Sequence, residues 1–182
     1  MARVEDVASF FITLGQQQAD NEIGDQVSHL RLQKLLYFAQ GCHLARYGKL
    51  LFENEMYAWQ LGPVVPEIYR KYKKYGNGGI PAEEPFDPDT LTQDEFALLL
   101  DVARKYDKFS TSKLINMTHQ AGTPWAQSKT NEVIPIPAIR SYFDSIIPLD
   151  SFEDALQRIE VITPGRDEEG NAVLPGSADD WD

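Results

Sequence analysis

Apolar residues recur at helical spacing along much of the chain, and the most regular stretch covers residues 28–48. Ser28 is a good N-cap, because its hydroxyl can accept a hydrogen bond from a backbone N–H of the first turn. Polar residues keep only the narrow strip of Gln33, Lys34 and Gln40, so the pattern predicts a central, buried helix. This helix is expected to end at Gly48, since glycine adopts the left-handed conformation without steric cost. Its apolar positions are Leu32, Leu35, Leu36, Tyr37, Phe38, Ala39, Cys42 and Leu44.

The next segment predicts a rigid connection followed by a second helix. Charges interrupt the apolar residues between positions 50 and 60, which indicates a short strand or an extended loop. Gly62-Pro63-Val64-Val65-Pro66 then predicts a rigid turn near the surface. Pro66 can begin a helix, because the first helical residue needs no N–H donor. That helix is expected to bury Ile68, Tyr69 and Tyr72 and to expose Glu67, Arg70, Lys71, Lys73 and Lys74.

Amphipathic patterns predict helices on both sides of this region. One covers residues 2–18, and another opens at Thr92 and Glu95, a capping box in which each side chain satisfies the other's free backbone N–H. Further helices are expected to start at Ser110 or Ser112, at Pro137 and at Ser151, with a turn at Thr123-Pro124-Trp125.

These elements predict a mainly α fold, a single-domain compact helical bundle of six to seven helices with at most a short β-hairpin. We expect a helical domain over residues 1–148, an additional helix over residues 149–162, and an acidic tail over residues 163–182.

Several motifs follow one another in a fixed order. The helix sequence LQKLLYFAQG precedes an acidic extended segment that ends at Trp59, and Gly62-Pro63-Val64-Val65-Pro66 then leads into Ile68 and Tyr69. Thr118-His119 and Thr123-Pro124-Trp125 continue the series. This combination resembles the Panacea antitoxin domain, a family also described as SocA-like, GepA-like or phage-associated proteins.

The resemblance implies an all-helical domain that neutralises a toxic partner protein in bacteria or phages. Together with the pattern of the chain, the motifs suggest two groups of residues. The motif positions with a structural role are Leu32, Leu35, Leu36, Tyr37, Pro66, His119, Pro124 and Trp125. The candidate partner-binding positions are Trp59, Gly62, Pro63, Val64, Tyr69, Arg70 and Lys73.

The net charge of −11 disfavours nucleic acid as the main partner, because phosphate binding draws on Lys and Arg. Residues 163–182 hold six acidic side chains against Arg166 alone, so −5 of this charge lies there. We expect a solvated, disordered tail, and the alternative is a segment that folds onto a basic partner with Trp181 as an apolar anchor.

Composition points to a cytoplasmic protein without a membrane partner. No apolar run approaches the roughly 20 residues that span a bilayer, and the first residues lack the form of a signal peptide. The single cysteine fits a reducing compartment.

The sequence offers no constellation for catalysis. It contains no GxSxG elbow, phosphate-binding glycine loop or Walker lysine. Cys42 and His43 would point about 100° apart on one helix, and no other pair has metal-ligand spacing. We therefore expect a protein that is not an enzyme and that uses no metal and no cofactor, with Cys42 packed in the core and His119 in a hydrogen bond.

Two features leave alternatives open. Residues 70–74 interleave basic side chains with tyrosines, which is a pattern of nucleic-acid binding, although a buried tyrosine stripe with solvated lysines is favoured. Trp125 is expected to cap the core, whereas structural and interface roles are equally open for Trp59.

The expected function is that of an antitoxin that binds its cognate toxin directly. The alternatives are an adaptor that delivers a partner to an energy-dependent protease and a regulator that binds nucleic acid through residues 70–74.

Overall fold

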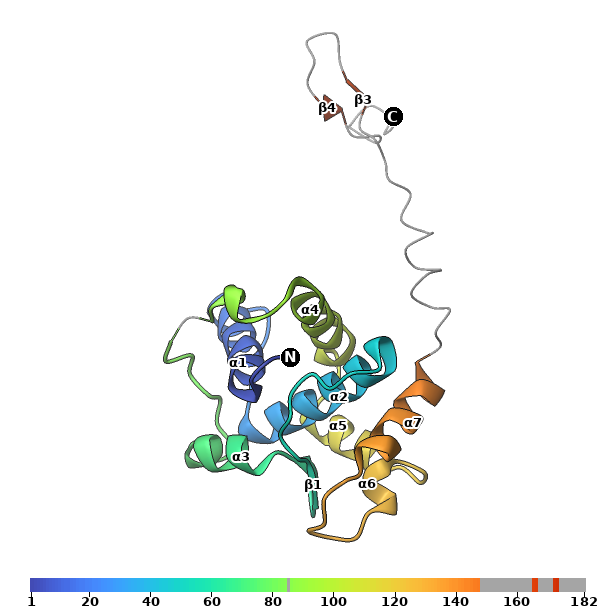
Figure 1. Ribbon diagram of the computed structural model, residues 1–182. Coiled ribbons are helices and arrows are strands. Elements are labelled where there is room, and N and C mark those ends of the chain that lie inside the picture. The colour runs from blue at the N-terminus through green and yellow to red at the C-terminus, as the bar shows by residue number, and fades with distance from the viewer. Residues whose placement is uncertain (85, 148–164, 167–171, 174–182) are drawn as a thin grey trace, which may run out of the picture. The chain divides into compact units, whose positions relative to one another are not determined.

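The computed structural model describes residues 1–84, 86–147, 165–166 and 172–173 (Figure 1). The first of two compact units covers Met1–Ile147 and the second covers Pro148–Asp182. The elements of the first unit are α1 (Val4–Asp20), α2 (His29–Tyr47), β1 (Tyr57–Trp59), β2 (Gly62–Val64), α3 (Pro66–Tyr72), the 3₁₀ turns η1 (Lys73–Tyr75) and η2 (Pro88–Thr90), α4 (Gln93–Asp107), α5 (Thr111–Thr118), α6 (Pro124–Gln127) and α7 (Ile136–Ile146). The mainly α fold predicted from the sequence is confirmed.

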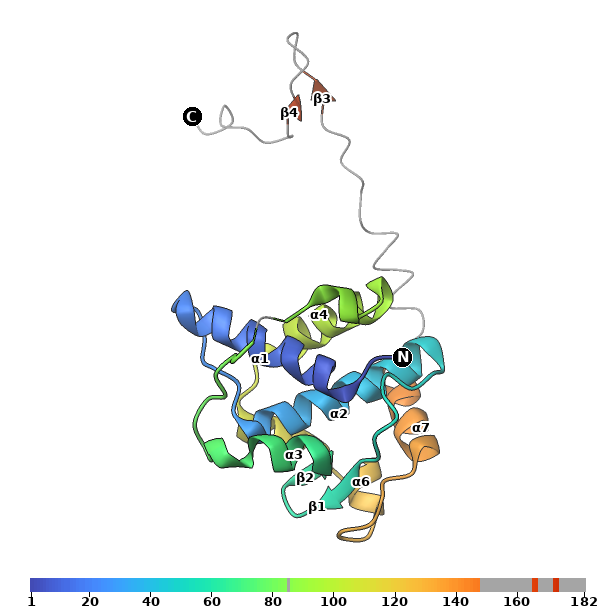
Figure 2. The same cartoon turned by 60° about the vertical axis from the view of Figure 1, so that its left-hand side comes forward.

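Helix α2 lies at the centre of the first unit, as predicted (Figures 1 and 2). It contacts α1, α3, α4, α5, α7 and β2. The Ser28 hydroxyl accepts a hydrogen bond from the Arg31 N–H at 3.3 Å, which satisfies one free donor of the first turn. Gly48 ends the helix with φ +66°, a conformation that L side chains rarely adopt.

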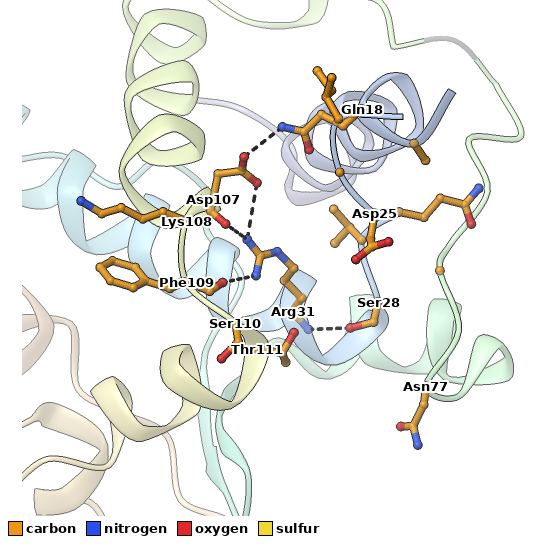
Figure 3. A pocket seen from close by; sticks show the side chains of 16 residues that line it. Gln18, Asp25, Ser28, Arg31, Asn77, Asp107, Lys108, Phe109, Ser110 and Thr111 are labelled. Carbon is orange, nitrogen blue, oxygen red and sulfur yellow. Dashed lines mark hydrogen bonds and ion pairs between the residues drawn. The ribbon is translucent and has the colours of Figure 1, made fainter. Parts of the chain in front are cut away.

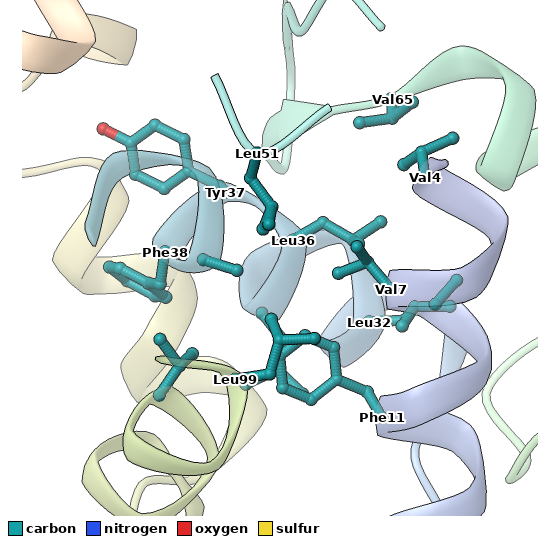
Figure 4. Packing of buried hydrophobic residues seen from close by; sticks show 14 of the residues in the cluster. Val4, Val7, Phe11, Leu32, Leu36, Tyr37, Phe38, Leu51, Val65 and Leu99 are labelled. Carbon is teal, nitrogen blue, oxygen red and sulfur yellow. The ribbon is translucent and has the colours of Figure 1, made fainter. Parts of the chain in front are cut away.

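The core fills the space between α1, α2 and α4 (Figure 4). Val7 and Phe11 of α1 lie opposite Leu32 and Leu36 of α2, and Leu99 of α4 closes the same layer. Further along α2, Phe38 stacks on Tyr106 of α4 with ring centroids 4.1 Å apart. Because α2 supplies side chains to every side of this core, the other helices are arranged around it.

A hairpin follows α2 and forms a small sheet. β1 pairs antiparallel with β2, and the pairing of Trp59 with Gly62 makes residues 60 and 61 the turn. Residues 131–134 run along the other side of β1, where Ala58 donates to the Glu132 carbonyl at 2.9 Å and Ile134 donates to the Met56 carbonyl at 2.7 Å. The expectation of a surface turn at positions 62–64 is wrong, because these residues form a buried strand.

The local helix signals elsewhere behave as expected. The capping box of Thr92 and Glu95 opens α4, and Ser110 caps α5. Helix α7 begins with Pro137 in its first turn, and Ile146 at its end is 43% exposed. In the second unit, β3 (Gly165–Arg166) pairs with β4 (Ala172–Val173), while the helix expected over residues 149–162 lies outside the described residues.

Replacing Leu36 by Ala is expected to lower the free energy of unfolding by about 2–5 kcal/mol, the usual range for a buried leucine. Leu36 is 0% exposed at the centre of α2, so the change leaves a cavity among three helices. Urea denaturation measures the loss, and Ile23→Ala at a 76% exposed position is the control. Equal midpoints for the two variants would contradict the central position of α2.

Candidate functional site

The polar strip of α2 is buried and holds the chain segment that follows the helix. The Gln40 amide group donates to the Phe52 carbonyl at 2.9 Å and accepts from the Leu51 N–H at 2.8 Å. About two turns closer to the N-terminus of α2, the Gln33 side-chain oxygen accepts a hydrogen bond from the Val65 N–H at 2.8 Å. Polar side chains that would be expected to contact water are therefore used to fix the backbone of residues 51–65.

Lys34 is the central member of this strip. Its side chain is 0% exposed, and its amine donates to the Pro63 carbonyl of β2 at 3.0 Å. No carboxylate forms an ion pair with it in the part of the chain that the structure describes. Burial disfavours the charged form and lowers the pKa of Lys34 to about 7. A lysine buried without a counter-charge is costly, and the Pro63 carbonyl is the group that compensates it.

Gly62 is required where β2 passes over this lysine. Its φ is +105°, and a Cβ atom there would lie 2.6 Å from the Lys34 amine and 2.8 Å from the Thr118 hydroxyl. Only glycine allows the strand to approach both groups so closely. The glycine of the Gly62-Pro63 motif is thus explained by packing.

The corner between α5 and α6 holds the other end of the hairpin. The Trp125 indole N–H donates to the Trp59 carbonyl at 2.8 Å, and Nε2 of His119 lies 3.1 Å from the Gln60 carbonyl. The two rings pack against each other with centroids 3.6 Å apart. The hairpin is therefore held from α2 on one side and from this corner on the other.

The side chains that the hairpin carries are partly open to solvent. Trp59 is half-buried and packs edge-on against Tyr69 of α3, with ring centroids 4.9 Å apart. Tyr69 in turn packs against the His29 ring at 5.6 Å. Leu61, in the turn of the hairpin, is 52% exposed.

The basic residues of α3 and η1 fall into two pairs. Lys74 forms an ion pair with Glu83 at 3.6 Å, and Lys71 faces Glu5 and Glu83. Arg70 and Lys73 are exposed, and neither has a salt bridge within the described residues. The Lys73 N–H donates to the Tyr69 carbonyl, so Lys73 lies one helical turn beyond Tyr69 on the same side. We call Trp59, Leu61, Tyr69, Arg70 and Lys73 the hairpin face.

A cleft of about 760 Å³ lies at the N-terminal end of α2, bordered by Asp25, Asp107 and Ser110 (Figure 3). Arg31 crosses its floor and donates to the carbonyls of Phe109 and Asp107, at 2.6 and 3.1 Å. The Asp107 carboxylate lies 3.6 Å from the same guanidinium. The Arg31 guanidinium is therefore used to hold the connection between α4 and α5.

The described residues offer few features for metal binding, membrane insertion or thiol chemistry. No group of three or more His, Cys, Asp or Glu side chains there is placed to hold a metal ion. Among the same residues, no helix is long and apolar enough to cross a membrane. Cys42 is buried, and burial raises the pKa of its thiol to about 11.

The sequence model of the family "Antitoxin SocA-like, Panacea domain" matches residues 32–126, which include α2, the hairpin, α3 and the α5–α6 corner. The chain belongs to the SocA-like antitoxin family. The Panacea domain here is 33% identical over 114 residues to Antitoxin SocA of Caulobacter vibrioides (strain NA1000 / CB15N). That match covers 54% of this chain and 58% of the relative, less than two thirds of the relative's length. No solved structure matches the chain.

The structure brings the motif residues of the Panacea domain together around the hairpin. Pro66 opens α3, while His119, Pro124 and Trp125 form the corner that anchors the turn. Leu32, Leu35, Leu36 and Tyr37 are core residues. Of the candidate partner-binding residues, Trp59 and Tyr69 are half-buried, Arg70 and Lys73 are exposed, and Gly62, Pro63 and Val64 are buried.

Lys34, Gln33 and Thr118 have structural roles at the site that sequence reasoning missed. A signal was present for Lys34, because a single lysine among the apolar residues of a central helix has no obvious route to water. Its partner could not be found in the same way, since the Pro63 carbonyl is 29 residues away and has no side-chain signature.

Replacing Lys34 by Met is expected to change how stability depends on pH. The pKa of Lys34 is about 7 in the folded protein, whereas an unperturbed lysine has a pKa of about 10.4, so between these pH values the unfolded chain binds the additional proton. Wild-type stability should therefore rise with pH from about 7 to 10 relative to Lys34→Met, by up to about 5 kcal/mol. Below pH 7 both states carry the proton, and the difference should be constant.

Urea denaturation at a series of pH values measures this slope. The loss of the bond to Pro63 adds a penalty of about 1–3 kcal/mol that does not depend on pH, so the slope and not the offset is diagnostic. Lys49→Met removes an exposed lysine and is the matched control. Parallel stability curves for wild type and Lys34→Met would contradict a neutral amine in the folded protein.

Proposed function

We propose that this protein is an antitoxin that neutralises a toxic partner protein by binding it directly, without chemical modification, and that the hairpin face makes the contact. The observation that carries the proposal is the use of the Panacea motif residues. They fix one hairpin from two sides, and that hairpin leaves Trp59 and Leu61 partly exposed. Rigid support of a few apolar side chains is what a binding surface requires.

The composition of the hairpin face agrees with a protein partner. Trp, Tyr and Arg are the residue types most enriched among interface residues that dominate binding, and all three are present. Gly62, Pro63 and Val64 support this face from below rather than contacting the partner, since they are buried.

The net charge of the chain also favours association with a protein. The described core, residues 1–147, holds 18 acidic and 15 basic side chains, whereas residues 148–182 hold 10 acidic and 2 basic ones. The C-terminal segment therefore contributes −8 of the total −11. An acidic segment can accelerate encounter with a basic toxin, while the hairpin face supplies the specific contact.

Trp59→Ala and Tyr69→Ala are each expected to weaken neutralisation while leaving the protein folded. Truncation of a central interface aromatic costs about 2 kcal/mol or more, which corresponds to a loss of roughly thirtyfold in affinity. Both side chains are half-buried, and the Trp59 carbonyl that anchors the hairpin is retained in the variant. The measurement is growth of cells that co-express each variant with the toxin encoded by the neighbouring gene.

Tyr142→Ala is the matched control, because it truncates another half-buried tyrosine on α7, away from α3 in both views (Figures 1 and 2). It should protect as well as wild type does. Circular dichroism of the purified variants separates a lost contact from a lost fold. Folded variants that still protect fully would place the interface elsewhere. If protection disappears in protease-deficient cells, the protein acts by delivering the toxin to a protease and not by binding alone.

A further inference from the structure

We propose that the hairpin face recognises a segment of the partner protein in which apolar side chains are flanked by carboxylates. The inference deepens the proposed function, on which it rests, by stating the chemistry of the partner. It combines two observations: a partly exposed aromatic and aliphatic surface, and two exposed cations that follow Tyr69 in the chain and have no salt bridge within the described residues.

The apolar part of the face has a preformed shape. Trp59 is fixed through its backbone by Trp125 and through its ring by Tyr69, so it loses little freedom on binding. Leu61 follows two residues later in a two-residue turn and is 52% exposed. A partner that covers these side chains must present apolar groups of its own, since polar groups buried there would lose their hydrogen bonds to water.

The cations of this region are distributed unevenly. Glu83 attracts Lys74, at 3.6 Å, and also accepts a hydrogen bond from the Tyr75 hydroxyl at 2.6 Å. Lys71 lies between Glu83 and Glu5. These two lysines therefore have their negative charge within the chain, on the side of η1 and α3 that faces α1 and residues 81–84.

Arg70 follows Tyr69 directly in α3 and Lys73 lies one turn beyond it, and neither has a salt bridge within the described residues. The acidic residue that acts on Arg70 is Glu67. Its carboxylate is engaged with Glu5 and accepts a hydrogen bond from Asn54 at 2.7 Å. The contact with Glu5 raises the pKa of Glu67. The described residues thus give Arg70 and Lys73 no salt bridge, and carboxylates of another protein can complement these two charges.

The hairpin face has too few cations without a salt bridge to favour the nucleic-acid alternative. Proteins that hold nucleic acid by its backbone commonly make about 6–10 phosphate contacts. The hairpin face offers two, and the neighbouring Lys71 and Lys74 are already opposed by Glu5 and Glu83. Two cations beside an apolar surface fit a short protein segment instead.

Short fluorescent peptides test the inference with the full-length chain. The first peptide alternates Glu with Leu and Phe, the second carries Lys in place of every Glu, and the third carries Ser in place of every apolar residue. Fluorescence anisotropy should show that the first peptide binds roughly tenfold or more tightly than either of the others, because only it satisfies both halves of the face. Its affinity should fall as salt is raised.

Two charge-reversed variants provide the matched comparison. Arg70→Glu with Lys73→Glu should weaken binding of the first peptide roughly tenfold or more, whereas Lys71→Glu with Lys74→Glu should leave it within about twofold. Both pairs are exposed, so neither change should unfold the protein. Equal affinity for all three peptides, no binding of the first, or equal loss in both variants would overturn the inference. Tight, salt-sensitive binding of a random DNA or RNA oligonucleotide would replace it with the nucleic-acid alternative.

Co-expression with the toxin separates this inference from the proposed function. If Arg70→Glu with Lys73→Glu protects cells as well as wild type does, the antitoxin function stands and the recognition chemistry is wrong. If wild type itself gives no protection, the proposed function fails, and the peptide measurements still decide what the face recognises.

Discussion

The buried amine of Lys34 imposes the constraint on which the rest of the Panacea domain depends. A lysine on a helix that is surrounded by other elements cannot reach water, and the described residues provide no carboxylate for it. The Pro63 carbonyl is therefore needed as its acceptor, at 3.0 Å. Leaving such a group unsatisfied would cost about 1–3 kcal/mol or more. This contact also accounts for the glycine at 62, because a Cβ there would lie 2.6 Å from the Lys34 amine and 2.8 Å from the Thr118 hydroxyl.

A hairpin fixed in this way can serve as a support for recognition. Gln33 and Lys34 hold the strand that returns, and Trp125 and His119 hold the strand that leaves and the turn. Of the motif residues, His119 and Trp125 serve this support, whereas Leu32, Leu35, Leu36 and Tyr37 fill the core. The exposed side chains lie at the turn and on α3. Such a division allows the exposed positions to change for different partners without loss of the hairpin, because the anchoring bonds go to backbone carbonyls and amides.

The sequence predicted part of this site for reasons that are local or based on the resemblance. Trp59, Tyr69, Arg70 and Lys73 were identified as candidates, and the structure places the Trp59 and Tyr69 rings in contact, with centroids 4.9 Å apart. The burial of positions 62–64 was missed, because a Gly-Pro pair normally indicates a turn and the strand pairing with residues 57–59 adds no signal of its own. The sequence also could not predict that Lys74 has an ion-pair partner while Lys73 has none within the described residues, because that partner, Glu83, lies in a separate segment.

The sequence by itself determined the central helix with both its ends and the starts of several other helices, although it gave Thr123-Pro124-Trp125 as a turn where α6 begins. Residues that start or end a helix act on backbone groups within about four residues of themselves, so their effect is independent of the rest of the fold. Here they are Ser28, Gly48, Thr92 with Glu95, and Pro137. The tertiary structure alone decided that the polar strip of α2 is internal and that the hairpin carries the exposed aromatic surface. The physical reason is distance along the chain. The bond from Lys34 to Pro63 spans 29 residues and that from Trp125 to Trp59 spans 66, and such partners are selected only when the whole core has assembled.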